Sequence, residues 1–454
     1  MDRISTSIDD LPDSILHHII SLLPTNLAVQ TSLVSKKWQD LWTFSSDLSF
    51  AVRLLNRNMM NSVERVLLLH NLSCLRSFTL TCLVDDDSYR VYSWISAIAN
   101  RKIEKLSLDL FHIVSPIKLP ACLFTCQSLT EFRLSMDYDL ALPSSVKLSN
   151  LKSLTLQRVK FLDERAIQSL FSSPLLEYLF VDKCDWKNLK SVSICGPKLS
   201  SLSINDHVII NKKISDRIVG DPDGCQVFIF GKGLKSFTYR GEFVNDYNFY
   251  DASSIVEVHI TAVQWDASDI YCSRLTNLLT GLSNVRDLRL SSQTLRVLNY
   301  DQRLISQLPI FNNLAGLTID TASVEYNNKA LQNIFENSPH LKTIEFIQGV
   351  SLGPEDDEDS GRSYSVSSSD LSNVKSIEIR HFEGSRWEEI YVVKSLLKRA
   401  PKLETMAISC WGNPSSLMLT KLHELLLDLP KTSKTCHLVF FDYDSYGRKI
   451  NCQN

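Results

Sequence analysis

The chain has 454 residues, of which 44% are hydrophobic and 22% charged, a composition typical of a protein with a large apolar core. Its 48 Lys and Arg against 51 Asp and Glu give a net charge of −3, which argues against a nucleic-acid-binding protein or a binder of acidic membranes. Only 14 residues are glycine, so the chain is poorly provided for glycine-rich phosphate loops.

The N-terminal residues Met1 to Ser5 are acidic and polar, without the basic-then-apolar order of a signal peptide. No apolar run approaches the ~20 residues needed to cross a bilayer. The 11 cysteines are scattered and include no Cys-x-x-Cys pair. We therefore expect no membrane contact, buried or inert thiols, and a location in the cytoplasm and/or the nucleus.

Residues 9–45, here called the head, predict three short amphipathic helices. Pro12 suits the first turn of the first helix, an apolar stripe follows, and Pro24 ends it. Thr25 can cap the second helix, and the third is expected from about Ser35. Because so short a segment cannot bury this much apolar surface alone, the head docks either on the rest of the chain or on a partner.

The stretch from Leu11 to Trp42 closely resembles an F-box, the motif that binds the Skp-type adaptor of cullin–RING ubiquitin ligases. Asn26 and Gln30 depart from the plant proteins of this family, which often have basic residues there; this affects a rim contact at most. The resemblance implies that the adaptor is bound by Leu11, Pro12, Ile15, Leu16, Ile19, Leu22, Leu23, Pro24, Val34, Trp38, Leu41 and Trp42.

After the head, one six-residue phrase, apolar-x-x-apolar-x-apolar, recurs along the chain. Its thirteen copies begin at Leu75, Ile103, Leu129, Leu151, Leu176, Leu199, Leu234, Ile255, Val285, Leu314, Leu341, Val374 and Leu403. From 75 to 403 is 328 residues in twelve intervals, a mean period of about 27, inside the range of leucine-rich repeats. The alternation in each phrase predicts a strand with one buried face, and such units must stack to bury it.

The segments between the phrases are more often helical. Helices are predicted over residues 163–171, 329–335 and 392–397, and each is followed by a proline that stops it (Pro174, Pro339 and Pro401). We therefore predict an α/β fold, in which a three-helix F-box precedes an irregular leucine-rich-repeat solenoid. A parallel sheet would form its concave face and helices its convex face.

The end of the chain contains two further features. Residues 351–370 hold an acidic run followed by serines, which is typical of a solvated loop; the ligand spacing of an EF-hand is missing. Residues 374–408 resemble the FBD module of a large plant family, through a strand, the turn from His381 to Gly384, a helix and a Pro-x-Leu-Glu phrase at Pro401. The predicted domains are the F-box (1–50), the repeats (51–372) and an FBD-like region that continues the stack (373–446).

Local signatures of catalysis are missing: we find no Gly-x-Ser-x-Gly elbow, no His-Glu-x-x-His and no Walker lysine loop. His17 and His18 are adjacent on a predicted helix and point about 100° apart, which disfavours a metal site. We expect a chain without catalytic activity, cofactor or metal. The resemblance implies the substrate-recognition subunit of an SCF-type (Skp–cullin–F-box) ligase.

Two alternatives stay open at this point. One is a repeat scaffold that never joins a cullin ligase. The other is a small-molecule receptor similar to the auxin and jasmonate receptors. The second is disfavoured because the strands lack the dense Arg and Lys floor that an inositol phosphate requires.

The target protein, whose identity the sequence does not give, is expected to contact outward residues of the repeat strands. Aromatic and arginine side chains tend to anchor interfaces, so Phe180, Tyr178 and Arg289 are the leading candidates. The full predicted set is Tyr178, Phe180, Asp182, Arg240, Glu257, His259, Asp287 and Arg289.

Overall fold

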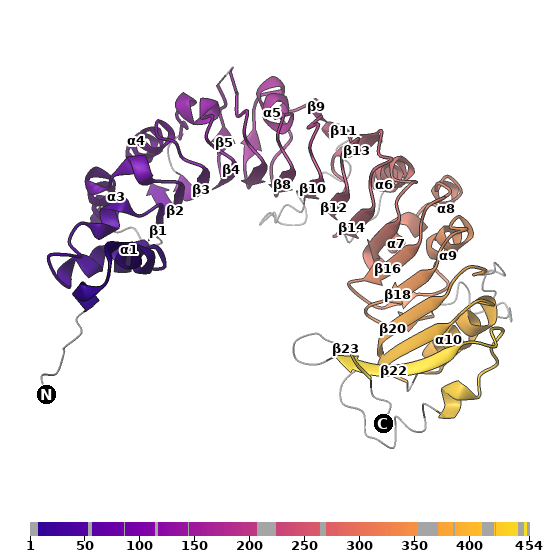
Figure 1. The fold of residues 1–454 in the computed structure, drawn as a ribbon. Helices are drawn as coiled ribbons and strands as arrows, with labels where there is room; N and C mark the ends of the chain where they lie inside the picture. Colours follow the sequence, from indigo (N-terminus) through magenta and orange to yellow (C-terminus); the bar gives the residue numbers. More distant parts are fainter. Residues whose placement is uncertain are drawn as a thin grey trace, which may run out of the picture. The chain divides into compact units, whose positions relative to one another are not determined.

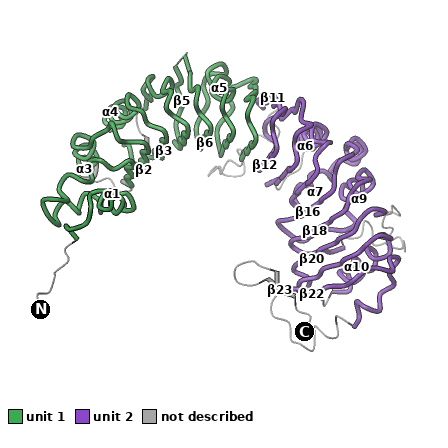
Figure 2. Tube along the Cα trace, in the orientation of Figure 1, with its two compact units in different colours: residues 1–208 green, residues 209–454 purple. Residues whose placement is uncertain are grey.

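Figure 1 shows the fold in a computed structural model. It describes residues 8–52, 57–85, 87–113, 117–143, 145–206, 224–263, 269–352, 371–384, 386–410, 422, 424–443 and 449–451. The chain divides into two compact units, residues 1–208 and 209–454 (Figure 2). The acidic run within 351–370 lies outside the described residues.

The head consists of short helices at the start of the first unit: η1 (Ile8–Asp10), α1 (Asp13–Ser21), α2 (Thr25–Gln30), η2 (Thr31–Leu33) and η3 (Leu41–Phe44). Pro12 and Pro24 stand immediately before α1 and α2, where a missing N–H costs no helical hydrogen bond. The third predicted helix is shorter than expected, because residues 36–40 form turns and only the 3-10 helix η3 follows.

Seven parallel strands follow in the first unit: β1 (Asp47–Val52), β2 (Ser77–Asp85), β3 (Lys105–Ile113), β4 (Glu131–Met136), β6 (Ser153–Gln157), β8 (Tyr178–Asp182) and β10 (Ser201–Asn205). Helices return the chain between several of them: α3 (Arg57–Leu69), η4 (Leu72–Cys74), α4 (Ser88–Ala99), η5 (Ala121–Thr125) and α5 (Glu164–Phe171). Three short strands complete the unit: β5 (Asp139–Leu140), β7 (Lys160–Phe161) and β9 (Ser191–Ile194).

The second unit repeats this plan. Its parallel strands are β12 (Ser236–Gly241), β14 (Glu257–Ala262), β15 (Asp287–Ser291), β16 (Gly316–Asp320), β18 (Thr343–Phe346), β20 (Ser376–Phe382), β21 (Thr405–Cys410) and β22 (His437–Tyr443), with β23 (Lys449–Asn451) antiparallel at the edge. The returning elements are β11 (Gln226–Phe230), β13 (Asp246–Tyr250), α6 (Asp269–Gly281), α7 (Ser292–Asn299), α8 (Gln302–Ile305), β17 (Val324–Glu325), α9 (Lys329–Glu336), β19 (Val350–Ser351) and α10 (Trp387–Arg399).

Every copy of the repeated phrase begins two residues before one of these strands. The thirteen leading residues are at most 4% exposed, and the alternate strand residues that follow them are buried with them. Strands β1 and β22 have no copy of the phrase, because Ser45 and Thr435 occupy the leading position. The fold is therefore the predicted α/β stack of leucine-rich-repeat type.

The returning layer differs from the prediction in one respect. The predicted helices are present as α5, α9 and a longer α10, but β9 in the first unit and β11 and β13 in the second return as strands. In β11, Val227 and Ile229 are fully buried and alternate with more exposed residues, a period of two that fits a strand. None of the described helices is long and apolar enough to cross a membrane.

Candidate functional site

The head exposes apolar side chains that a folded chain normally buries. Exposed fractions are 45% for Ile15, 71% for Leu22, 43% for Leu27, 86% for Leu33 and 60% for Val34. These five, here called the exposed head residues, come from α1, α2, η2 and the residues that end them. Their apolar surface is exposed to water, and burying it against a partner would stabilise the complex.

The structure divides the twelve predicted adaptor-binding residues into three groups. Leu16, Trp38 and Trp42 are 0%, 2% and 6% exposed, so they form the core of the head and hold its helices together. Half-buried are Leu11, Ile19, Leu23 and Leu41, and exposed are Pro12, Ile15, Leu22, Pro24 and Val34. The prediction omitted Leu27 and Leu33; both are visibly apolar in the sequence, but only the packing of α2 and η2 shows that they face solvent.

A clamp of polar contacts closes the head. The Asp9 carboxylate accepts hydrogen bonds from the Ser35 hydroxyl and the Trp38 indole N–H, both at 2.9 Å. The Lys37 ammonium donates to the backbone carbonyls of Asp9 and Leu11 at 2.8 and 2.7 Å, and pairs with the Asp13 carboxylate at 3.4 Å. These contacts tie the residues before α1 to the turn that carries Trp38.

The head also docks on the first repeat strand. The Ser49 N–H of β1 donates to the Thr25 hydroxyl at 2.7 Å, so Thr25 joins head to sheet and does not cap α2 as predicted. His70 Nε2 lies 2.9 Å from the Ser45 carbonyl oxygen. Burial lowers the pKa of His70, although its hydrogen bond to Ser45 opposes the shift. The sequence left open whether the head docks on the rest of the chain or on a partner. One side of the head contacts the rest of the chain through Thr25 and Ser45, and the exposed head residues are still free to contact a partner.

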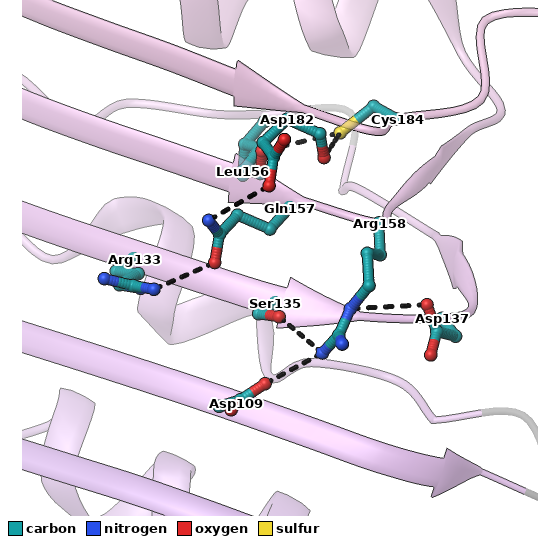
Figure 3. A network of polar contacts seen from close by, with 9 residues as sticks. All are labelled: Asp109, Arg133, Ser135, Asp137, Leu156, Gln157, Arg158, Asp182 and Cys184. Atoms are coloured by element: carbon teal, nitrogen blue, oxygen red, sulfur yellow. Dashed lines mark hydrogen bonds and ion pairs between the residues drawn. The ribbon is translucent and has the colours of Figure 1, made fainter. Parts of the chain in front are cut away.

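The sheet face of the first unit carries a polar network that links neighbouring strands (Figure 3). Gln157 accepts from Arg133 at 3.0 Å and donates to Asp182 at 3.3 Å. Arg158, at a left-handed φ of 57°, turns its guanidinium back to the Ser135 hydroxyl at 2.7 Å and the Asp109 carboxylate at 2.9 Å. Asp182 is thus held by cross-strand hydrogen bonds, a role that the sequence prediction did not give it.

The other two predicted contacts of the first unit stand out from the face of β8. Tyr178 is 54% exposed, and Phe180 is half-buried on the same side of the strand. Small hydroxyl residues lie beside them on both neighbouring strands (Ser153, Thr155, Ser201 and Ser203). The two rings therefore project above the small side chains of the neighbouring strands, as the anchor residues of an interface do.

The second unit brings four predicted residues together. Glu257 lies opposite Asp287 and His259 opposite Arg289 on the paired strands β14 and β15, beside a depression of about 420 Å³. His259 Nε2 is 3.0 Å from an Asp320 carboxylate oxygen and 3.2 Å from the Thr261 hydroxyl. Arg240, on β12, is exposed and lies outside the lining of this depression, opposite Thr261 in the register.

The FBD-like turn is organised by one buried carboxylate. Glu389 of α10 is 4% exposed and accepts hydrogen bonds from the backbone N–H groups of Glu383 and Gly384 at 3.1 and 2.8 Å. Gly384 has a φ of 69°, and a Cβ there would lie 2.8 Å from a Leu422 methyl. Burial raises the pKa of Glu389, while the two N–H donors oppose the shift. This explains Gly384 of the turn and Glu389 of the helix that follows it as structural residues.

The last groups to consider are the side chains that could bind a metal ion and the cysteine thiols. Among the residues that the structure describes, no group of three His, Cys, Asp or Glu is placed to hold a metal ion. Burial raises the pKa of the Cys82 thiol to about 12, and that of Cys184 further, so neither is a nucleophile near neutral pH.

A head of short helices followed by stacked strand-and-return units makes this chain similar to F-box proteins with leucine-rich repeats. The F-box domain family matches residues 8–48, and the family described as FBD-associated F-box protein At5g56370, LRR repeats, matches residues 91–219.

Curated relatives in Arabidopsis thaliana match most of the chain. The F-box/FBD/LRR-repeat protein At5g56420 is 29% identical over 97% of this chain and 99% of its own length. The putative FBD-associated F-box protein At1g55030 is 27% identical over 96% and 98%. An internalin structure from Listeria monocytogenes covers 91% of this chain and 93% of its own at 13% identity, but its TM-score of 0.32 supports no conclusion. The resemblance to plant F-box/FBD/leucine-rich-repeat proteins is thus confirmed, and these families indicate an adaptor-type protein.

Proposed function

We propose that this chain is the substrate-recognition subunit of an SCF-type ubiquitin ligase. The head would bind a Skp-type adaptor, and through it a cullin–RING ligase, while the sheet faces would bind the target protein. Ubiquitin transfer would be carried out by other subunits, and this chain would contribute proximity. Its place of action would be the cytoplasm and/or the nucleus.

The observation that supports this proposal most is the set of exposed head residues. Leu22, Leu33 and Val34 are each more than half exposed on a head whose own core is formed by other residues, among them Leu16, Trp38 and Trp42. Full burial of one such side chain is worth about 1.5–3 kcal/mol. Three of them therefore offer several kcal/mol to a partner that covers them, which matches the adaptor-binding role of the F-box family.

Co-expression with a Skp-type adaptor tests the proposal. We expect a one-to-one complex on gel filtration, and its loss when Leu11 and Pro12 are both changed to alanine. A cullin pull-down with the purified complex then separates a ligase subunit from a scaffold. Failure to bind the adaptor would overturn the proposal, and an adaptor complex that recruits no cullin would favour the scaffold.

A further inference from the structure

The depression on the second unit is formed by strands β12, β14, β15, β16 and β18. It is lined by two rows of outward side chains, one at the first position of each strand and the other two residues further on. Gly316 occupies the first row between Asp287 and Thr343. A Cβ at Gly316 would lie 2.5 Å from the nearer Asp287 carboxylate oxygen and 3.2 Å from the Thr343 hydroxyl. The missing side chain thus makes room for the Asp287 carboxylate, which lies over Gly316.

The first row carries two neighbouring negative charges. Glu257 and Asp287 are opposite each other in the register, an arrangement that destabilises a sheet. Glu257 has no side-chain hydrogen bond or ion pair with any residue that the structure describes. The one ion pair of Asp287 among those residues is with Arg286, at 4.0 Å.

Charged neighbours at or near the start of other strands have opposite signs. In the first unit, Lys105 and Glu131 are opposite each other at the start of β3 and β4 and form an ion pair at 2.6 Å. In the second unit, Lys375 and Glu404, just before β20 and β21, pair at 2.7 Å. The like-charged pair of Glu257 and Asp287 therefore differs from these two pairs.

The second row presents the opposite charge. Arg289 is exposed, and its guanidinium has no partner within the described parts of the chain. The acidic groups near it are engaged: Asp320 is paired with His259 at 3.0 Å and Glu345 with Arg380 at 3.8 Å. Among the described residues, an unpaired cation thus lies two residues along the strand from Asp287, whose carboxylate has only the 4.0 Å pair with Arg286.

We infer that this depression binds an extended segment of the target protein that carries a basic and an acidic side chain two residues apart. The inference rests on the proposed function and names the class of target. Alternate residues of an extended chain are about 6.6 Å apart on one side, which is the separation of the two rows. The basic side chain lies between Glu257 and Asp287, and the acidic side chain binds the fork of Arg289.

The spacing of the two charges gives the sharpest test. Surface plasmon resonance would measure the full-length chain on immobilised alanine-rich peptides that carry one Lys and one Glu at spacings of one, two or three residues, in both orders. We expect the spacing of two, in one of the orders, to bind at least about fivefold more tightly than the other spacings. Equal binding at all three spacings would overturn the inference.

Substitutions in the chain locate the contact. Glu257→Gln together with Asp287→Asn should weaken binding of the preferred peptide by about 3-fold to about 30-fold, since each exposed ion pair contributes modestly. Glu257→Gln alone, at an exposed site, guards against misfolding and should show part of this loss. Glu404→Gln, which removes a carboxylate just before β21, is the matched control and should bind as wild type does.

The outcomes separate this inference from the proposed function. A chain that binds the adaptor but does not distinguish the peptides refutes the inference alone. A chain that prefers the spacing of two but binds no adaptor refutes the ligase role alone. Unchanged peptide binding by the double variant Glu257→Gln with Asp287→Asn would also refute the inference.

Discussion

Replacing Asp9 by alanine should loosen the head selectively. The substitution removes an ionised acceptor for the Ser35 hydroxyl and the Trp38 indole N–H and leaves the buried indole N–H without this partner. Each hydrogen bond to a charged group is worth about 1.5–3 kcal/mol, and the half-buried position of Asp9 reduces this. We expect a loss of about 2–4 kcal/mol, which corresponds to an increase of about 30-fold to about 900-fold in the opening of the head.

Hydrogen exchange of the head amides measures this directly. Peptides from residues 13–33 should lose protection by that factor, while peptides from β14 to β16 should exchange as in the wild type. Asp13→Ala is the control, because the Asp13 side chain is 73% exposed and makes one described ion pair, with Lys37 at 3.4 Å. It should change protection by less than about fivefold. Protection of the head within threefold of wild type in Asp9→Ala would refute the role of the clamp.

Three further predictions concern groups whose pKa is shifted by burial. The pKa of His70 is lowered from 6.5, so the stability that neutral His70 contributes is complete above that pH and is lost as pH falls through the folded pKa. In urea unfolding between pH 5 and 7.5, His70→Gln should reduce the dependence of the unfolding free energy on pH. The pKa of Glu389 is raised from 4.5, so the stability that protonated Glu389 contributes is lost as pH rises through its folded pKa. Over that pH range the wild type should lose stability relative to Glu389→Gln, and a stability difference between the two that does not change with pH would contradict this. Burial raises the pKa of Cys82 to about 12, so a thiol reagent at pH 8 should label half-exposed Cys74 well before Cys82, and equal rates would argue against the burial.

The strands could be predicted from the sequence because their signal is local. A six-residue phrase decides which side of a strand is buried, and every copy found is followed by a strand. The two strands without a copy were missed because Ser45 and Thr435 replace the leading apolar residue. The strands of the returning layer were missed for another reason: their pattern of alternation is short, and it competes with the helices expected in this layer.

The candidate sites could be predicted only in part. Alternation correctly placed Tyr178 and Arg289 on the outer side of their strands. It could not show that Asp182 is bound by its neighbours, because cross-strand pairs depend on register, which loop lengths set. In the head, the apolar stripe contained Ile15 and Leu16 alike, and only the packing of the helices separates the exposed residue from the buried one.

We expect the exposed head residues to form the adaptor-binding surface, and isothermal titration calorimetry with a purified Skp-type adaptor measures their contribution. Leu33→Glu places a charge where the side chain is 86% exposed, and Ile310→Glu does the same at a 58% exposed position of the second unit. We predict that Leu33→Glu weakens adaptor binding by at least about 30-fold, since a charge buried against apolar surface is costly. Ile310→Glu should bind as wild type does. Equal affinities of the adaptor for Leu33→Glu and Ile310→Glu would mean that the exposed head residues do not bind the adaptor.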